Sequence, residues 1–460
     1  MKLKRFLSVF LVVLLMASTA LPMAAAVETP DPPKVEDPQI RAKGALLVDL
    51  NTGLPVYAKG EHQELYPASL TKIMTALLVL EAVDSGKLTL DQMVTASASA
   101  LEGLAADGSS AGIKVGETMS VENLLYCMLI VSANEACDIL AEAVSGSVDA
   151  FVAAMNAKAK ALGCENTHFV NPNGLHDSRH YTSAWDLYLI TKAAMEYEEF
   201  MKICDTADVV LPATNLAPER HLYTTNYLLS SWRVVGYRNK AAHGIKTGST
   251  DEAGHCLVST ATKGSLHFLS VILGAERVET NGVGDVQSFS ETTRLFQWGF
   301  DNFSYQSVLR ADEVIKEVAV SLSRKVNYVT VHPAQDVEAL LPKGLAAADL
   351  ERVVTLKQDP IEAPIAQDQV LGTVTLRHDG KEFATVDLLA LNSVEASKLL
   401  TFWRNVQLFF QKTVVRVICV ILGLLLLALA GWKITMGRRR YRYGRTVSTN
   451  NSKYRGRRKH

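Results

Sequence analysis

The sequence predicts an α/β protein of the α+β type, in which helices pack on an antiparallel sheet and a small β-rich domain follows. Three observations lead to this prediction. Strand patterns with turn signals lie on both sides of a mostly helical stretch, at 45–58 and at 255–273. After about residue 304 the pattern changes to alternating and β-branched runs, and His378-Asp379-Gly380 predicts a tight hairpin. The chain of 460 residues is 48% hydrophobic, which is enough for the cores of two or three domains.

The N-terminus has the charge and hydropathy pattern of a secretory signal. Three basic residues precede an apolar run at 6–16, and small residues then lead to Ala26. We expect residues 1–26 to be a signal peptide; the alternative is an uncleaved N-terminal anchor. Residues 27–38 are rich in proline and acidic side chains, so we expect a flexible leader there.

Residues 39–303 are expected to form the first domain. It begins with two apolar strands, 45–50 and 54–58, which are separated by the turn sequence Asn51-Thr52-Gly53. A second strand pair surrounds Lys263-Gly264, and we expect the strands from both ends to form one antiparallel sheet that carries the helices. The expected helices are 70–83, 121–144, 148–162, 183–195 and 285–303.

Residues 304–393 are expected to form the small β-rich C-terminal domain. The following stretch, 394–412, has large apolar side chains at helical spacing and is expected to be a membrane-proximal amphipathic segment. A helix packed on its own domain is the alternative. The clearest strand patterns of the β-rich domain are 326–331, 370–376 and 383–389.

Residues 413–436 are expected to form one transmembrane helix. The central part, 417–432, has no charged side chain, and with its flanks it would extend roughly 36 Å as a helix. A buried helix of a soluble protein is the alternative. The last 24 residues, 437–460, carry ten basic side chains and no acidic one, which predicts a cytoplasmic tail. We therefore expect a single-pass protein of the cell membrane, with membrane lipid as a partner and an extracytoplasmic catalytic domain.

The formal net charge of −1 conceals an uneven distribution. The part of the chain between the two basic ends has 34 basic and 48 acidic side chains. Such an acidic main body argues against a nucleic-acid partner. The tail is expected to be a topology signal and a contact for anionic lipid. Six cysteines without a C-x-x-C pair argue against a zinc module, and the five before the span leave at least one free thiol.

The sequence Ser69-Leu70-Thr71-Lys72 lies at the predicted start of an amphipathic helix, after Pro67. Residues three apart share one face of a helix, so the Lys72 amine can take the proton of the Ser69 hydroxyl. This requires burial or a second cation to lower the lysine pKa from roughly 10.4. Alone the motif is weak, since a capping serine followed by a solvated lysine has the same sequence.

Two further motifs are also weak by themselves. In Ser132-Ala133-Asn134, at a junction between two helical stretches, the hydroxyl can relay a proton and the amide can bind a peptide carbonyl. In Lys246-Thr247-Gly248, the lysine and the threonine hydroxyl can hold a carboxylate, and the glycine lets a ligand approach the backbone. However, Ser448-Thr449-Asn450 also matches the first pattern, and an ordinary turn before a strand would explain the second.

Together the three motifs are specific. Their first residues are 63 and 114 positions apart, and their order resembles the penicillin-recognising serine enzymes. More narrowly, residues 43–393 resemble the low-molecular-mass D-alanyl-D-alanine carboxypeptidases of peptidase family S11. Further matching sequences are Tyr66-Pro67-Ala68, Val115-Gly116-Glu117, Asn166-Thr167-His168-Phe169, Asn171-Pro172-Asn173-Gly174-Leu175, His180-Tyr181-Thr182-Ser183-Ala184 and 244–254.

The resemblance implies a β-lactamase/transpeptidase-like sheet with a helix cluster, and it implies roles for eight residues. Ser69 would be the nucleophile and Lys72 its base, and the backbone N–H groups of Ser69 and Ser249 would form the oxyanion hole. The family commonly has glycine at Ala133, a small change that we expect to be tolerated. It commonly has histidine at Ser249, where the backbone donor is retained but substrate preference is expected to differ. The catalytic residues would be Ser69, Lys72, Ser132 and Asn134, and the substrate-binding residues Lys246, Thr247, Gly248 and Ser249.

The expected function is that of a serine-type D-Ala-D-Ala carboxypeptidase. It would remove the terminal D-alanine from peptidoglycan stem pentapeptides through an acyl-enzyme, and it would bind β-lactam antibiotics. We expect no metal or organic cofactor, and we expect the cluster of His168, His176, Asp177 and His180 to be structural. The alternatives are a class A-like β-lactamase, whose Glu-x-x-Leu-Asn motif is absent between Ser132 and Lys246, and an inactive cell-wall-binding or assembly protein.

Overall fold

The computed structural model describes residues 35–104, 108–280 and 283–443, so the predicted signal peptide and most of the basic tail lie outside the described residues. The chain divides into two compact units. The first includes the residues up to 306 together with 340–346, and the second includes 307–339 and the residues from 347 onward. The predicted domain boundary before residue 304 falls in β12 (Phe303–Leu309), which pairs with β15 (Val337–Pro342).

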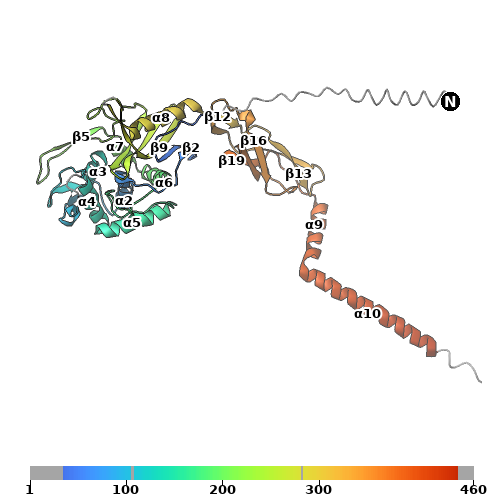
Figure 1. Ribbon diagram of the computed structural model, residues 1–460. Helices are drawn as coiled ribbons and strands as arrows, with labels where there is room; N and C mark the ends of the chain where they lie inside the picture. Colours follow the sequence, from blue (N-terminus) through green and yellow to red (C-terminus); the bar gives the residue numbers. More distant parts are fainter. Residues whose placement is uncertain (1–34, 105–107, 281–282, 444–460) are drawn as a thin grey trace, which may run out of the picture. The chain divides into compact units, whose positions relative to one another are not determined.

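A five-stranded antiparallel sheet forms the centre of the first unit (Figure 1). Along the fully buried β1, Leu46 and Val48 belong to one core, whereas Ala45 and Leu47 belong to the core on the other face. Strands from both ends of the unit pair in this sheet, as the sequence predicts. The order is β2 (Pro55–Lys59), β1 (Gly44–Asp49), β9 (Leu266–Ala275), β8 (Gly254–Lys263), β7 (Ala242–Thr250).

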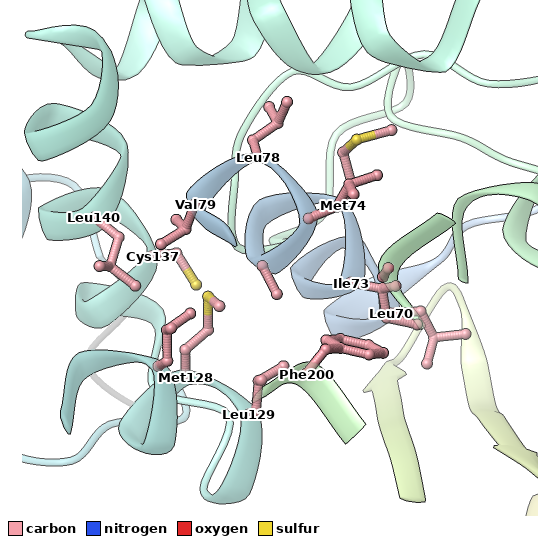
Figure 2. Close-up of a cluster of buried hydrophobic side chains, with 14 of the residues drawn as sticks. Leu70, Ile73, Met74, Leu78, Val79, Met128, Leu129, Cys137, Leu140 and Phe200 are labelled. Carbon is pink, nitrogen blue, oxygen red and sulfur yellow. The ribbon is translucent and has the colours of Figure 1, made fainter. Parts of the chain in front are cut away.

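A cluster of helices packs on one face of the sheet, with α2 (Lys72–Asp84) at its centre. This helix is buried without interruption from Lys72 to Leu80, and Figure 2 shows its side chains near Met128, Leu140 and Phe200. The prediction that it is amphipathic is wrong, because a helix enclosed by others needs apolar residues on all its faces. The other helices of this cluster are α3 (Val121–Ile130), α4 (Asn134–Ser145), α5 (Val148–Ala161), α6 (Ala184–Ala194) and α7 (Glu198–Cys204).

The helical stretch predicted over 121–144 consists of two helices, α3 and α4, which meet at the junction predicted around Ser132. Ser132 has a φ of 64°, a left-handed conformation that cannot continue a right-handed helix. At its start, α3 is capped by the Ser120 hydroxyl, which accepts a hydrogen bond from Asn123 N at 3.2 Å. The interruption leaves Ser132 between the two helices and makes Asn134 the first residue of α4.

The opposite face of the sheet is covered by α8 (Gln287–Asn302). Its Leu295, Phe296 and Phe300 share a core with Leu47 and Phe268 of the sheet. Three two-stranded sheets also belong to the described part of the first unit. They are β3 (Met93–Thr95) with β4 (Thr118–Ser120), β5 (Asp208–Leu211) with β6 (Arg220–Tyr223), and β10 (Arg277–Thr280) with β11 (Val283–Val286).

The second unit is built on a six-stranded sheet. The hairpin between β18 and β19 turns at Asp379 and Gly380, both with positive φ, as the sequence predicts. All its strand pairs are antiparallel except that of β13 with β17. The order is β16 (Glu351–Leu356), β18 (Val370–His378), β19 (Lys381–Ala390), β14 (Tyr328–Pro333), β13 (Lys316–Ser321), β17 (Ile361–Glu362).

Two helices follow this sheet. In α9 (Lys398–Gln411) the large apolar side chains are exposed, and Arg404 donates hydrogen bonds of 2.9 and 2.7 Å to Glu362 of β17. In α10 (Thr413–Tyr443), residues Thr413–Met436 are long and apolar enough to cross a membrane and are not buried against the rest of the protein. The apolar side chains exposed on α9 are Leu399, Phe402, Trp403, Leu408, Phe409 and Phe410.

All six cysteines lie among the described residues and are free thiols. Burial raises the pKa of both Cys127 and Cys137 to about 12, so these thiols remain protonated at neutral pH. The expectation of at least one free thiol before the span is confirmed.

Candidate active site

Ser69 and Lys72 meet at the start of the central helix. Ser69 lies in the 3₁₀ helix η1 (Ala68–Thr71), which leads directly into α2, and Lys72 is the first residue of α2. The Lys72 Nζ atom donates hydrogen bonds to Ser69 Oγ at 2.9 Å, to Asn134 Oδ1 at 2.8 Å and to the carbonyl oxygen of Asn173 at 2.5 Å. The amine is thus held against the hydroxyl by acceptors from two other parts of the chain.

Lys72 is fully buried, and this burial lowers the pKa of its amine. Nearby Cys137, Asp138 and Glu135 act in the opposite direction, but burial dominates. A buried lysine with a lowered pKa can lose its proton more easily than one in water. Lys72 therefore meets the condition under which it can act as a base toward Ser69.

The junction between α3 and α4 places Ser132 and Asn134 beside Ser69 and Lys72. Ser132 is buried, and among the described residues its hydroxyl has no hydrogen-bond partner. A buried hydroxyl without a partner is costly unless a ligand or water satisfies it. Asn134 contacts Lys72 directly, so the junction contributes one side chain to the base and leaves one hydroxyl free for a ligand.

The third motif, Lys246-Thr247-Gly248, lies on β7, which runs beside Ser69. Lys246 is buried, and burial, followed by the charge of Lys72, lowers the pKa of its amine to about 7. Its neighbour Thr247 shares a hydrogen bond of 2.7 Å with Thr225, a residue that none of the sequence motifs indicates. A β-carbon on Gly248 would lie 2.8 Å from the carbonyl oxygen of Pro67, so only glycine allows this close approach.

These residues surround one cleft of about 250 Å³. Five of the eight predicted site residues line it, while Lys72, Asn134 and Lys246 lie buried around them. The structure thus brings all eight together, and their individual roles stay predictions. The lining residues are Ser69, Ser109, Ser132, Thr225, Tyr227, Thr247, Gly248, Ser249, His255, Cys256, Arg277, Val286, Ser288 and Phe289.

The loop that contains Asn173 and Gly174 packs against the segment that carries Ser69 and against the start of α2. Thr75 Oγ1 donates to the carbonyl oxygen of Pro172 at 2.6 Å, and the carbonyl of Asn173 binds Lys72. The Asn-Pro-Asn-Gly-Leu motif is visible in the sequence, but its contact with Lys72 was not predicted. Its turn-forming residues were the signal that this loop has a demanding conformation.

The histidine cluster serves a structural purpose at His180. The His180 Nδ1 atom accepts a hydrogen bond from Val170 N at 3.2 Å, and its Nε2 atom contacts Thr71 Oγ1 at 2.8 Å. Thr71 Oγ1 in turn donates to the carbonyl oxygen of Ala68 at 2.8 Å. Burial lowers the pKa of His180 to about 4, so the ring is neutral at pH 7. Within the described part of the chain, no group of three or more His, Cys, Asp or Glu side chains is arranged to hold a metal ion.

Comparison with known proteins is decisive for the family. Residues 31–277, more than half of the chain, match the family described as D-alanyl-D-alanine carboxypeptidase. The chain belongs to this carboxypeptidase family. Residues 303–396 match the C-terminal domain of penicillin-binding protein 5. The resemblance inferred from the three motifs is therefore confirmed.

Individual relatives cover most of the carboxypeptidase chain. The D-alanyl-D-alanine carboxypeptidase DacF of Bacillus subtilis is 32% identical over 402 residues, which is 87% of this chain and 97% of the relative. DacA of Haemophilus influenzae is 32% identical over 366 residues, covering 78% and 87% of the two chains. The crystal structure of penicillin-binding protein 5 from the same organism has a TM-score of 0.62 and 32% identity, covering 79% of this chain and 100% of that one. This similarity confirms the predicted fold class.

Proposed function

We propose that this protein is a serine-type D-alanyl-D-alanine carboxypeptidase that removes the terminal D-alanine from peptidoglycan stem pentapeptides. The observation that carries the proposal is the 2.9 Å contact between Lys72 Nζ and Ser69 Oγ at the edge of the cleft. Membership of the carboxypeptidase family and the names of the relatives support the same reaction.

In the proposed reaction, Ser69 Oγ attacks the carbonyl carbon of the penultimate D-alanine while neutral Lys72 takes the hydroxyl proton. The backbone N–H groups of Ser69 and Ser249 would stabilise the resulting oxyanion. The peptide C–N bond then breaks, the leaving nitrogen receives a proton, and free D-alanine departs. Water subsequently hydrolyses the ester between Ser69 and the shortened peptide, which restores the hydroxyl.

The other motif residues bind and orient the peptide in this proposal. Lys246 and Thr247 would hold the terminal carboxylate, and Gly248 lets β7 lie close to the backbone of the segment that carries Ser69. Ser132 lines the same cleft, and its hydroxyl has no hydrogen-bond partner in the described part of the chain, which supports its role in passing a proton to the leaving nitrogen. Asn134 would hold Lys72 in place and bind a carbonyl of the peptide.

We further propose that β-lactams acylate Ser69 and are released slowly. Their lactam carbonyl and adjacent carboxylate mimic the last two D-alanines of the substrate, so the same cleft would accept them. Among the described residues, no aspartate or glutamate side chain lines the cleft, and fast deacylation of the class A β-lactamase type needs such a base. This observation favours a carboxypeptidase over the β-lactamase alternative.

The membrane arrangement is also a proposal. Helix α10 would cross the membrane once, with the catalytic unit outside the cytoplasm and the basic tail inside. The exposed aromatic side chains of α9 would contact lipid at the membrane surface, and its bond to Glu362 would keep it beside the β-rich unit. We expect no nucleic-acid partner for the acidic main body.

The full-length protein in detergent can test the proposed chemistry. Wild type should release D-alanine from diacetyl-Lys-D-Ala-D-Ala and should carry a fluorescent penicillin on Ser69, located by peptide mass spectrometry. Ser69→Ala should abolish both signals, and Lys72→Ala should slow labelling by at least ~10²-fold. Ser85→Ala, an exposed serine at the other end of α2, should change neither. A wild-type protein without label or product would instead support the inactive wall-binding alternative.

A further inference from the structure

A buried carboxylate lies beside the active site and has no part in the reaction described above. Asp138 is on α4, one turn after Asn134, and only 6% of its surface is exposed. Its two carboxylate oxygens accept hydrogen bonds from Asn173 Nδ2 at 3.3 and 3.5 Å. Burying a carboxylate in a helical core is costly, so its presence there needs a reason.

Asn173 connects Asp138 to the proposed base. While its side-chain amide donates to Asp138, its main-chain carbonyl accepts the 2.5 Å hydrogen bond from Lys72. The Asn173 Oδ1 atom is also occupied, since it accepts from Leu175 N at 3.0 Å. The side-chain amide, the side-chain oxygen and the main-chain carbonyl of Asn173 thus bind Asp138, Leu175 and Lys72 in turn. Asn173 therefore forms a bridge between the Asp138 carboxylate and the Lys72 amine.

The other acidic groups near Asp138 are occupied elsewhere. Glu135 Oε1 accepts hydrogen bonds from three donors of the neighbouring loop, and Glu142 accepts from two serine hydroxyls. The charged groups that act on Asp138 are Lys72 from α2 and Glu135 and Glu142 from α4. The titratable groups that interact with Lys72 are Glu135, Cys137 and Asp138 from α4, Lys246 from β7 and His180 from the loop before α6.

We propose that Asp138 is a positioning residue of the active site, which acts through Asn173 to place Lys72 against Ser69 and to set the pH at which the Lys72 amine becomes neutral. This inference rests on the proposed function, in which Lys72 is the base for Ser69. As a carboxylate, Asp138 favours the ammonium form of Lys72; as a neutral acid, it favours the free amine.

The titration of the two groups supports this coupling. Burial raises the pKa of Asp138 to about 7, against the opposing effects of the Asn173 hydrogen bond and the charge of Lys72. Burial lowers the pKa of Lys72, against the opposing effects of Cys137 and Asp138. The two pKa values therefore move toward each other, so that the protonation of one group depends on the charge of the other.

The test is the pH dependence of Ser69 acylation by fluorescent penicillin in the full-length protein. Asp138→Asn removes the charge but keeps an oxygen that can accept from Asn173. Without the carboxylate the Lys72 amine should become neutral at a lower pH, and the acid limb of the rate profile should shift down by about one pH unit or more. The maximal rate should change by less than threefold, because the bridge to Lys72 persists.

Three further variants separate charge from packing. Asp138→Glu retains the carboxylate and should keep the acid limb close to that of wild type. Asp138→Leu removes the charge and the acceptor, so its limb should shift as in Asp138→Asn and its maximal rate should also fall at least tenfold. Glu142→Gln removes a neighbouring charge on the same helix that does not contact Asn173, and its acid limb should stay in place.

An unshifted acid limb in Asp138→Asn would overturn the inference while leaving the proposed function intact. The inference also fails if Glu142→Gln shifts the limb equally, or if neither charge-free variant folds, since Asp138 would then be purely structural. Failure of the proposed function looks different, because wild type itself would carry no label on Ser69.

Discussion

A β-carbon on Gly174 would lie 1.9 Å from the carbonyl oxygen of Ala68, the residue immediately before the nucleophile. Gly174 also has a φ of 85°, and Ala68 itself has a positive φ of 47°. Only glycine can combine this conformation with so close an approach. The loop that contains Gly174 and the segment that carries Ser69 therefore pack directly against each other through their backbones.

Gly174→Ala should displace the Ser69 segment. A clash with a main-chain oxygen cannot be relieved by rotating a side chain, so we expect a loss of stability and at least a ~10²-fold slower acylation. Gly163→Ala is the matched control, because Gly163 has a φ of 83° and open space around its missing side chain. Thermal melts should show Gly174→Ala to be less stable than the control by roughly 1–3 kcal/mol. Equal melting temperatures and equal acylation rates would contradict this explanation.

Lys246 should give the reaction an alkaline limb. Burial, together with the charge of Lys72, lowers the pKa of Lys246 to about 7, so the amine is cationic below this pH and becomes neutral above it. Because a neutral amine binds a carboxylate weakly, kcat/KM for D-alanine release should fall as the pH rises through about 7. Lys246→Ala should lose this limb and reduce kcat/KM about ten- to a hundredfold at pH 6. A substrate with an amidated C-terminus is the control, and it should respond much less to both changes.

Arg220 should be required for stability, because it neutralises a buried acid. Glu117 is buried, and its carboxylate accepts from Arg220 Nη2 at 2.9 Å and lies 2.6 Å from Nη1. Burial alone would raise the Glu117 pKa, but the hydrogen bonds from Arg220, Thr214 and Lys114 outweigh it and lower the pKa. Arg220→Ala leaves an unpaired buried charge and should cost ~3–5 kcal/mol at pH 7.

The pH dependence provides the check on that pair. A carboxylate whose folded pKa is depressed contributes stability above its unfolded pKa of roughly 4.3, and this contribution disappears as the pH falls through the folded value. Denaturant melts of wild type and Arg220→Ala should therefore differ most at neutral pH and converge only as the pH falls through the depressed folded pKa of Glu117. Arg179→Ala, which breaks the exposed pair with Asp177, should have little effect at either pH.

The direction of the membrane span can be tested with a reporter fused after His460. The basic tail predicts that this reporter stays in the cytoplasm, whereas protease added outside intact cells should reach the catalytic unit. A chain ending at Lys412 retains α9 but lacks α10, and a high-salt or carbonate wash should extract it more readily than the full-length protein. Export of the reporter at His460 would refute the predicted topology.

Several structural features follow from local patterns, and these were predictable. The turn at His378-Asp379-Gly380 specifies its hairpin because the left-handed residues are adjacent in sequence. The apolar run that begins at Ala45 likewise predicted a strand, and this strand is the buried β1. The amphipathic character assigned to α2 was wrong, because the exposure of a helical face depends on which other helices cover it. The junction at Ser132-Ala133-Asn134 was also predicted, and the left-handed φ of Ser132 separates α3 from α4 there.

The sequence by itself determined the family, the compartment signals and the eight candidate site residues, because each of these is encoded in short motifs or in local charge and hydropathy. Only the tertiary structure decided what surrounds those residues. Lys72 and Asn173 are 101 positions apart and yet share a hydrogen bond, and Asp138 joins them through the amide of Asn173. Such contacts depend on how helices and loops pack across the core, and no local periodicity specifies which distant residues that packing will bring into hydrogen-bonding contact.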